Sequence, residues 1–265
     1  MTIPLSVRAI PSLTFRAWLT PPPIAPSTLE RDRGAMVDFI PVYYGGIPGH
    51  EIGSGRVAIA LHGWGGRPAQ MAPSARQLAA EGHRVIVPQL PGHAGGTPTD
   101  IKQVAAAIDG VVEDVGTPSL LVAHSFASMA LRLAFSDEAP RRVALIAPAL
   151  DVRDALDVFA DRLRLLPWAR RGLGSRLESW DPGLWPTLSQ SPAHQLGDAE
   201  VLIMHDPDDR DTPFARSAEL AAIRPATTIA VIEGAGHSRI LSDPATLDRL
   251  VAFANGSEVS EESAA

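Results

Sequence analysis

The chain of 265 residues contains no cysteine. This absence excludes disulfide frameworks, thiolate zinc sites and cysteine nucleophiles. Basic side chains are also in deficit, because 23 Lys and Arg residues stand against 30 Asp and Glu residues and leave a formal net charge of −7. Phosphate binding needs a surplus of Lys and Arg, so we expect no nucleic-acid partner. The length fits one soluble domain with an insertion, large enough to hold its core without a metal or a disulfide.

Long apolar runs are absent as well. The longest stretch without a charge, residues 115–131, is interrupted by glycine, proline, histidine and serine. It is too polar for a membrane-spanning helix of about 20 apolar residues. Near the N-terminus, Arg8, Pro11 and Arg16 break the region in which a signal peptide has its apolar run. We therefore expect no membrane partner and a cytoplasmic location.

The two ends of the chain differ in composition from its middle. Residues 1–35 are rich in proline without a sustained period, which predicts an extended arm with at most one short helix. The polar residues 257–265 predict a disordered tail. Between them, residues 36–44 are typical of a strand, residues 45–49 of a turn and residues 56–61 of a buried strand.

Short apolar strands then alternate with amphipathic helices. The predicted strands cover residues 84–88, 119–123, 143–147, 200–204 and 227–232, and the predicted helices cover 70–81, about 126–137 and 213–223, with two more capped by Asp100 and Asp243. This alternation predicts an α/β protein with a doubly wound, mostly parallel sheet covered by helices on both faces. We assign the core to residues 36–150 and 200–256.

The alternation stops over residues 151–199. This stretch combines helical fragments with several prolines and with Trp168, Trp180 and Trp185, which indicates an inserted helical lid and not further sheet. The tryptophans would supply an apolar wall of a binding site if they face inward, and the alternative is plain packing. Four arginines (Arg162, Arg164, Arg170 and Arg171) would attract an anionic substrate or form a solvated helix face.

Ser125 lies where a predicted buried strand runs directly into a helix. This strand, turn and helix order is typical of a nucleophile elbow, in which the residues two before and two after the nucleophile must be small. Ala123 and Ala127 meet that requirement. The alternative is a serine that only caps the helix.

A serine hydroxyl needs a base to take its proton, and the base needs an acid to orient it. His237 follows the predicted strand 227–232 in a loop with two glycines, and residues 205–211 (HDPDDRD) follow the strand 200–204. The order Ser, Asp, His is the one expected for a nucleophile elbow. Alternatively, His205 and the aspartates of that loop (Asp206, Asp208, Asp209 and Asp211) would chelate a hard cation.

These motifs resemble those of the α/β-hydrolase superfamily over about residues 36–255. The resemblance implies a catalytic triad of Ser125, Asp209 and His237, with Asp208 as the alternative acid. The segment His62-Gly63-Trp64 matches the family's His-Gly-x motif, so the backbone N–H groups of Trp64 and Phe126 are implied as the oxyanion hole.

The implied activity is hydrolysis of a carboxylic ester or a related acyl bond of a small molecule through an acyl-enzyme. The alternatives are carbon–carbon bond hydrolysis, acyl transfer, or a slow-turnover receptor for a small molecule on the same fold. No nucleotide cofactor is implied, because Pro68 breaks the dinucleotide-binding pattern that begins at Gly63. We assign no metal, because hard-cation sites usually space their carboxylates by a defined loop pattern. The sequence does not predict the oligomeric state.

Overall fold

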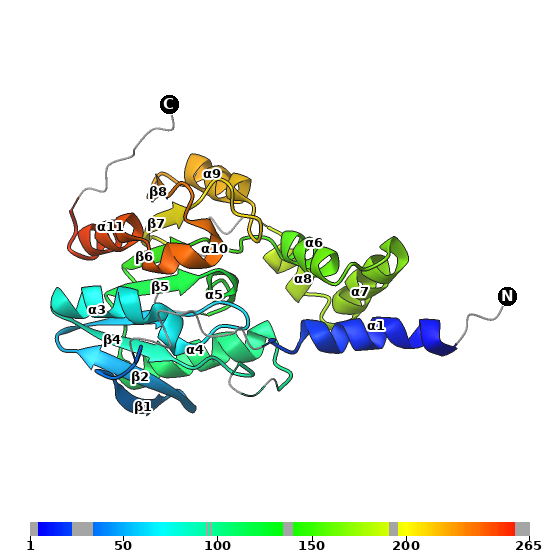
Figure 1. Ribbon diagram of the computed structural model, residues 1–265, viewed down its shortest axis with the longest axis horizontal. Coiled ribbons are helices and arrows are strands. Elements are labelled where there is room, and N and C mark those ends of the chain that lie inside the picture. Colours follow the sequence, from blue (N-terminus) through cyan, green and yellow to red (C-terminus); the bar gives the residue numbers. More distant parts are fainter. Residues whose placement is uncertain are drawn as a thin grey trace.

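The computed structural model describes residues 5–22, 34–93, 95, 97–134, 140–190 and 196–257. An 8-stranded sheet in the order β1-β2-β4-β3-β5-β6-β7-β8 lies between two layers of helices (Figure 1). Strands β3 to β8 are parallel, and β1 and β2 add an antiparallel edge. The predicted mostly parallel α/β sheet is confirmed. The strands are β1 (Ile40–Tyr44), β2 (Ile47–Gly53), β3 (Arg56–Leu61), β4 (His83–Pro88), β5 (Leu120–His124), β6 (Arg142–Ile146), β7 (Glu200–His205) and β8 (Thr227–Val231).

The helices connect these strands as the sequence period predicts, with some changes in length. The helix expected over residues 126–137 is only five residues long and is followed by turns, and residues 135–137 lie outside the described part. The helices are α1 (Leu5–Trp18), η1 (Pro68–Met71), α3 (Ala72–Ala80), α4 (Ile101–Val115), α5 (Phe126–Ala130), α6 (Val152–Arg162), α7 (Pro167–Trp180), α8 (Leu184–Leu188), α9 (Phe214–Ile223), α10 (Gly236–Arg239), η3 (Ile240–Ser242) and α11 (Pro244–Ala254). Among the described residues, no helix is long and apolar enough to cross a membrane.

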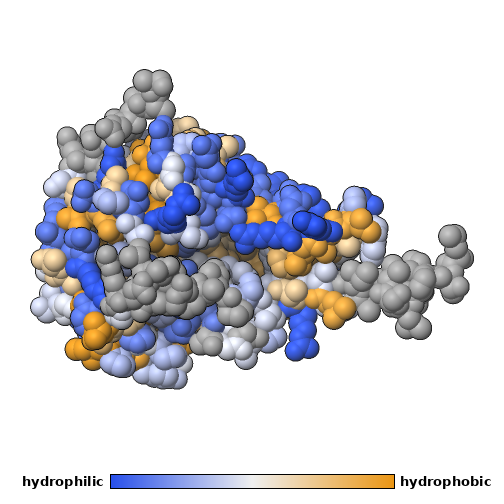
Figure 2. All heavy atoms as spheres, viewed as in Figure 1, coloured by the Kyte–Doolittle hydropathy of each residue, from blue (hydrophilic) through white to orange (hydrophobic). Residues whose placement is uncertain are grey.

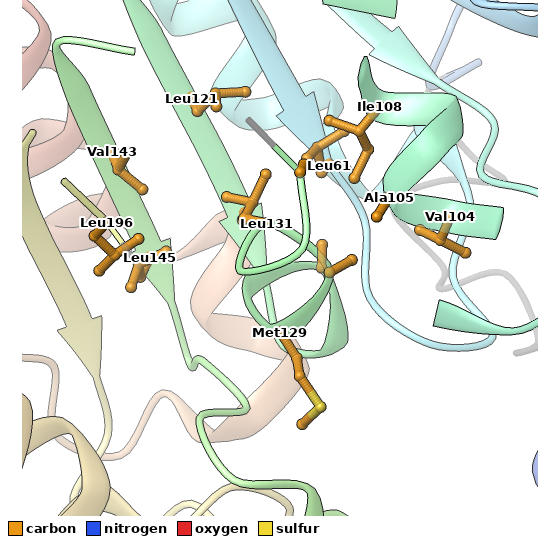
Figure 3. Close-up of a cluster of buried hydrophobic side chains, with 14 of the residues drawn as sticks. Leu61, Val104, Ala105, Ile108, Leu121, Met129, Leu131, Val143, Leu145 and Leu196 are labelled. Carbon is orange, nitrogen blue, oxygen red and sulfur yellow. The ribbon is translucent and has the colours of Figure 1, made fainter. Parts of the chain in front are cut away.

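The period of two along each strand builds a separate core on each face of the sheet. In β5, Leu121 and Ala123 pack with α4, α5 and α9, whereas Leu120 and Val122 pack with α3 and α11. Figure 3 shows part of the first of these cores, in which Leu131 lies beside the strand that carries Leu121 and Met129 lies on the helix beyond the end of that strand. Each fully buried side chain of this size contributes about 1.5 to 3 kcal/mol. Because β5 packs into a core on each face of the sheet, it gives Ser125 and the residues that follow a fixed starting point.

The start of the sheet differs from the sequence prediction. Residues 36–39 precede the strand β1, and residues 47–49, predicted as part of a turn, begin β2. The turn is only Gly45-Gly46, both at positive φ (59° and 71°), which fits a two-residue hairpin. Pro48 and Gly49 hid this second strand because both residues are usually depleted in strands.

The N-terminal arm is also different from its prediction, because α1 is a helix of 14 residues over Leu5–Trp18. It packs on α7, where Phe15 and Trp180 meet edge to face at 5.6 Å and Trp18 meets Phe159 of α6 at 5.2 Å. Contacts with α6 and α7, which are distant in sequence, thus stabilise a helix that its prolines argued against. Residues 23–33 of the arm and 258–265 of the predicted tail lie outside the described residues.

Helices α6, α7 and α8 follow β6 and lie to one side of the sheet (Figure 1). Arg132, just after α5, is buried and holds both ends of this segment. Its guanidinium donates to the carbonyl oxygens of Leu150, Thr187, Leu188 and Gln190 at 2.7–3.0 Å. Burial lowers the pKa of Arg132 to about 10. The segment is therefore attached to the chain that continues from α5.

Candidate active site

Ser125 has a backbone conformation that non-glycine residues rarely adopt, with φ 54° and ψ −122°. Such a conformation costs on the order of 1–3 kcal/mol and persists only where surrounding contacts enforce it. Here the Ser125 N–H donates to Ile146 O at the end of β6, and Ser125 O accepts from the N–H groups of Ser128 and Ala149. The neighbouring strand therefore holds the turn that exposes the hydroxyl.

Small residues surround this turn. Ala123 and Ala127 are fully buried, and a Cβ built on Gly63 would lie only 3.0 Å from Ser125 Cβ. The hydroxyl of Ser125 makes no helix-capping hydrogen bond. The geometry is therefore that of the predicted elbow and not that of a serine capping a helix.

The hydroxyl meets one histidine, and that histidine meets one aspartate. Ser125 Oγ lies 2.9 Å from His237 Nε2, and His237 Nδ1 lies 2.7 Å from Asp209 Oδ2. The structure thus brings Ser125, His237 and Asp209 together at the carboxyl ends of β5, β7 and β8. Asp208, the alternative acid, is exposed, and its backbone N–H donates to Asp206 Oδ1.

The Asp209 carboxylate is inaccessible to solvent and has several donors. Its Oδ1 accepts from the N–H groups of Asp211 and Thr212, and its Oδ2 also accepts from the Thr212 hydroxyl at 2.9 Å. Burial alone would raise the pKa of Asp209, but the contacts with His205 and His237 outweigh it and hold this pKa well below the usual range. Asp209 is therefore an ionised acceptor at neutral pH.

Two further residues fix the backbone beside His237. Asp206 Oδ2 accepts from Gly236 N, and His124 Nε2 donates to His237 O at 2.9 Å. From the sequence, Asp206 was considered only as a ligand for a cation, and its contact with Gly236 N was not predicted. The backbone is thus held at Gly236 N, before His237, and at the carbonyl oxygen of His237 itself.

The two residues implied as oxyanion donors are neighbours in space. Trp64 follows Gly63, which approaches Ser125 closely, and Phe126 is the first residue of α5. Their rings meet at 4.8 Å. The first N–H groups of a helix have no partner within it, so the N–H of Phe126 is available for a ligand.

The three tryptophans predicted to line a substrate site do not share one location. Trp168 and Trp180 are 38% and 42% exposed and belong to α7, which lies at the end of the molecule away from the sheet (Figure 1). Hydrophilic and hydrophobic side chains are mixed on the surface of that end (Figure 2). Trp180 contacts Phe15 because α1 covers that side of α7. The structure does not bring these two residues to Ser125. Trp185 is half-buried and packs against the core that contains Met129.

The predicted arginine cluster is partly paired. Arg162 forms an ion pair with Asp211, and Arg170 forms one with Asp157. Exposed pairs of this kind contribute little to stability. These ion pairs do offset the positive charges of Arg162 and Arg170, which were considered from the sequence as attracting an anionic substrate.

Asp209, Asp211 and His237 bring ligand atoms within 4.8 Å of one another, as a cation site requires. However, Asp209 and His237 already bind each other through the atoms that a cation would use. The same geometry therefore favours the acid and base pairing over metal binding.

Two buried histidines, His62 and His124, should make the free energy of unfolding depend on pH. Burial, reinforced by His93 in one case and by His237 in the other, lowers the pKa of His62 and of His124 from 6.5 to about 3. Between these values the unfolded chain binds protons that the folded chain does not. The free energy of unfolding should be highest above pH 6.5 and fall toward pH 3, by up to about 1.4 kcal/mol per pH unit for each histidine.

Urea unfolding at several pH values checks this prediction. The His62→Gln variant should show a shallower decline in unfolding free energy than the unmodified chain, because it has one titrating histidine fewer. Equal slopes for the two proteins between about pH 6 and about pH 4 would contradict the assignment.

Comparison with known proteins agrees with this architecture. The model of the Alpha/beta hydrolase family matches residues 58–250, so the chain belongs to that family. No curated protein sequence matches the chain.

Solved structures resemble it at low sequence identity. A membrane phospholipase A is 18% identical, with 94% of this chain and 93% of that chain covered and a TM-score of 0.63. The 2-hydroxy-6-oxo-6-phenylhexa-2,4-dienoate hydrolase of Rhodococcus sp. strain RHA1 is 19% identical, with 83% and 99% covered and a TM-score of 0.60. An esterase from Exiguobacterium antarcticum is 18% identical, with 80% and 99% covered and a TM-score of 0.58. Likeness at this identity establishes the fold and leaves the substrate open.

Proposed function

We propose that the chain is a serine hydrolase that cleaves a carboxylic ester or a related acyl bond through an acyl-enzyme intermediate. The observation that carries this proposal is the hydrogen-bonded series of Ser125, His237 and Asp209, with the serine at a positive φ. A hydroxyl placed on a base, with the base placed on a buried carboxylate, is the arrangement that activates serine for attack on a carbonyl.

In the proposed cycle, Ser125 Oγ attacks the substrate carbonyl while His237 Nε2 takes the hydroxyl proton. Asp209 accepts the Nδ1–H of His237 and stabilises the imidazolium that forms. The N–H groups of Trp64 and Phe126 bind the oxyanion, and loss of one such donor typically raises the barrier by about 3 to 4 kcal/mol. His237 then protonates the leaving group, and water activated by the same histidine hydrolyses the acyl-enzyme.

The α6–α8 segment acts in this proposal as a lid over a small-molecule acyl substrate. Its attachment through Arg132 and the packing of Trp185 against the core that contains Met129 support that role. Trp185 is the one of the three predicted tryptophans that we retain for the substrate wall. The location we propose remains the cytoplasm, with neither a membrane nor a nucleic acid as partner.

Product analysis tests the proposal and separates it from its alternatives. Esters with acyl chains of increasing length are incubated with the protein, and the products are identified by mass spectrometry. An acid with an alcohol supports ester hydrolysis, whereas an acid with a ketone from a diketone substrate supports carbon–carbon cleavage. A new ester supports acyl transfer, and tight ligand binding with negligible turnover supports a receptor. If no ester in the panel is hydrolysed faster than in buffer, the proposal is wrong.

A further inference from the structure

His205 is a second histidine beside the proposed catalytic acid, and unlike His237 it is buried. It is the last residue of β7, and its side chain is inaccessible to solvent. Its Nε2 lies 3.3 Å from Asp209 Oδ2, the same oxygen that His237 contacts, and 3.2 Å from the Thr212 hydroxyl. Its Nδ1 lies 2.7 Å from Ser217 Oγ on α9. The mechanism described so far makes no use of this residue.

The partners of His205 define which ring nitrogen carries a proton. An ionised carboxylate only accepts hydrogen bonds, so the nitrogen beside Asp209 must be the Nε2–H form. The Thr212 hydroxyl gives its one hydrogen to Asp209 Oδ2 at 2.9 Å and can accept from His205 through a lone pair. In the neutral ring, Nδ1 is then an acceptor, and the Ser217 hydroxyl donates to it. A buried series of contacts thus runs from Ser217, which is hydrogen-bonded to His205 Nδ1, to Asp209 Oδ2, which lies 3.3 Å from His205 Nε2.

We propose that His205 is a positioning residue for the acid of the active site, with Ser217 fixing its tautomer. This inference rests on the proposed function. Through Nε2–H, His205 holds Asp209 Oδ2 in place against His237 and withdraws part of the carboxylate charge from it. Asp209 lies 3.3 Å from His205, and His237 contacts the same carboxylate oxygen. His124, at the end of β5, is close enough for a charge on His205 to lower its pKa.

The variants His205→Leu and His205→Gln separate positioning from packing. Leucine removes the donor, so the carboxylate loses one constraint, and we expect kcat to fall about 10-fold to 100-fold with KM unchanged. The acid limb of the kcat profile should move to higher pH, because the freed carboxylate binds the imidazolium of His237 more strongly. Glutamine supplies an amide N–H near the position of Nε2 and should restore most of kcat and the original limb.

A buried histidine elsewhere gives the matched control. His83 starts β4 at the opposite end of the strands, is equally inaccessible, and hydrogen bonds to Leu78 O through Nδ1. His83→Leu should lower the melting temperature and leave the acid limb unchanged. A loss of stability in His205→Leu with a kcat and an acid limb like those of the unmodified protein would overturn the inference.

Ser217→Ala keeps the test decisive if His205→Leu fails to fold. We expect a smaller fall in kcat and a shift of the acid limb in the same direction, and an unchanged profile overturns the inference. Labelling with a fluorophosphonate probe distinguishes this failure from failure of the proposed function. If the probe labels Ser125 but the His205 and Ser217 variants keep the kcat and the acid limb of the unmodified protein, the positioning role alone is refuted. If the unmodified protein takes no label and shows no turnover, the proposed function itself is refuted.

Discussion

Replacing Ser125 with alanine should lower kcat by a factor on the order of 10⁶, because removal of the nucleophile of such a triad costs about as much as removal of the whole triad. The hydroxyl contacts His237, and its loss leaves the backbone hydrogen bonds of the elbow in place. Two measurements check the prediction: kcat with the best ester of the panel, and the mass of the adduct with a fluorophosphonate probe. The unmodified protein should gain one label at Ser125, and the variant should gain none.

Ser128 provides the control for this experiment. It is a buried serine three residues further along the chain, and its hydroxyl donates to Ala123 O at 3.4 Å. Ser128→Ala should keep the label and most of the activity. Normal turnover in Ser125→Ala, or a label on another residue, would show that Ser125 is not the nucleophile.

Replacing Asp209 with asparagine should lower kcat by a factor on the order of 10⁴. Asparagine retains an oxygen for the N–H groups of Asp211 and Thr212 but can present an amide N–H to His237 Nδ1. This would favour the histidine tautomer with its proton on Nε2, which cannot accept the proton of Ser125. We therefore expect a loss of kcat and an unchanged fold, as measured by circular dichroism.

Asp208→Asn is the matched control, since it changes the same atoms one residue earlier in an exposed side chain. It should leave kcat within about twofold, as expected of an exposed surface position. Equal losses of kcat in the two variants would indicate a general effect on the loop after β7. A loss confined to Asp208→Asn would show that Asp208, and not Asp209, is the acid.

The sequence was sufficient for the parallel part of the sheet. The strands predicted at 119–123, 143–147 and 227–232 agree within one residue with β5, β6 and β8. They were recognisable because both faces of a central parallel strand are buried, which gives short continuous apolar runs. The placement of Ser125 and His237 follows from the same pattern, since each comes after the end of such a run.

Other parts depended on contacts that no local pattern contains. α1 gains its partners from α6 and α7, which lie more than one hundred residues further along the chain. The contact between His205 and Ser217 forms only because α9 packs against the end of β7. In the sequence, a histidine at the end of a strand looks the same with or without such a partner. The second strand of the edge hairpin was hidden by Pro48, which sequence patterns penalise. Pro48 is tolerated because it lies at the start of β2, before the residues that pair with β4.

The conformation of Ser125 has a consequence for any attempt to stabilise this protein. Glycine adopts a positive φ freely, so the residue that best suits the fold at position 125 has no hydroxyl. A library selected only for heat resistance would therefore favour inert chains at this position. Engineering of this protein should measure turnover alongside melting temperature in every round.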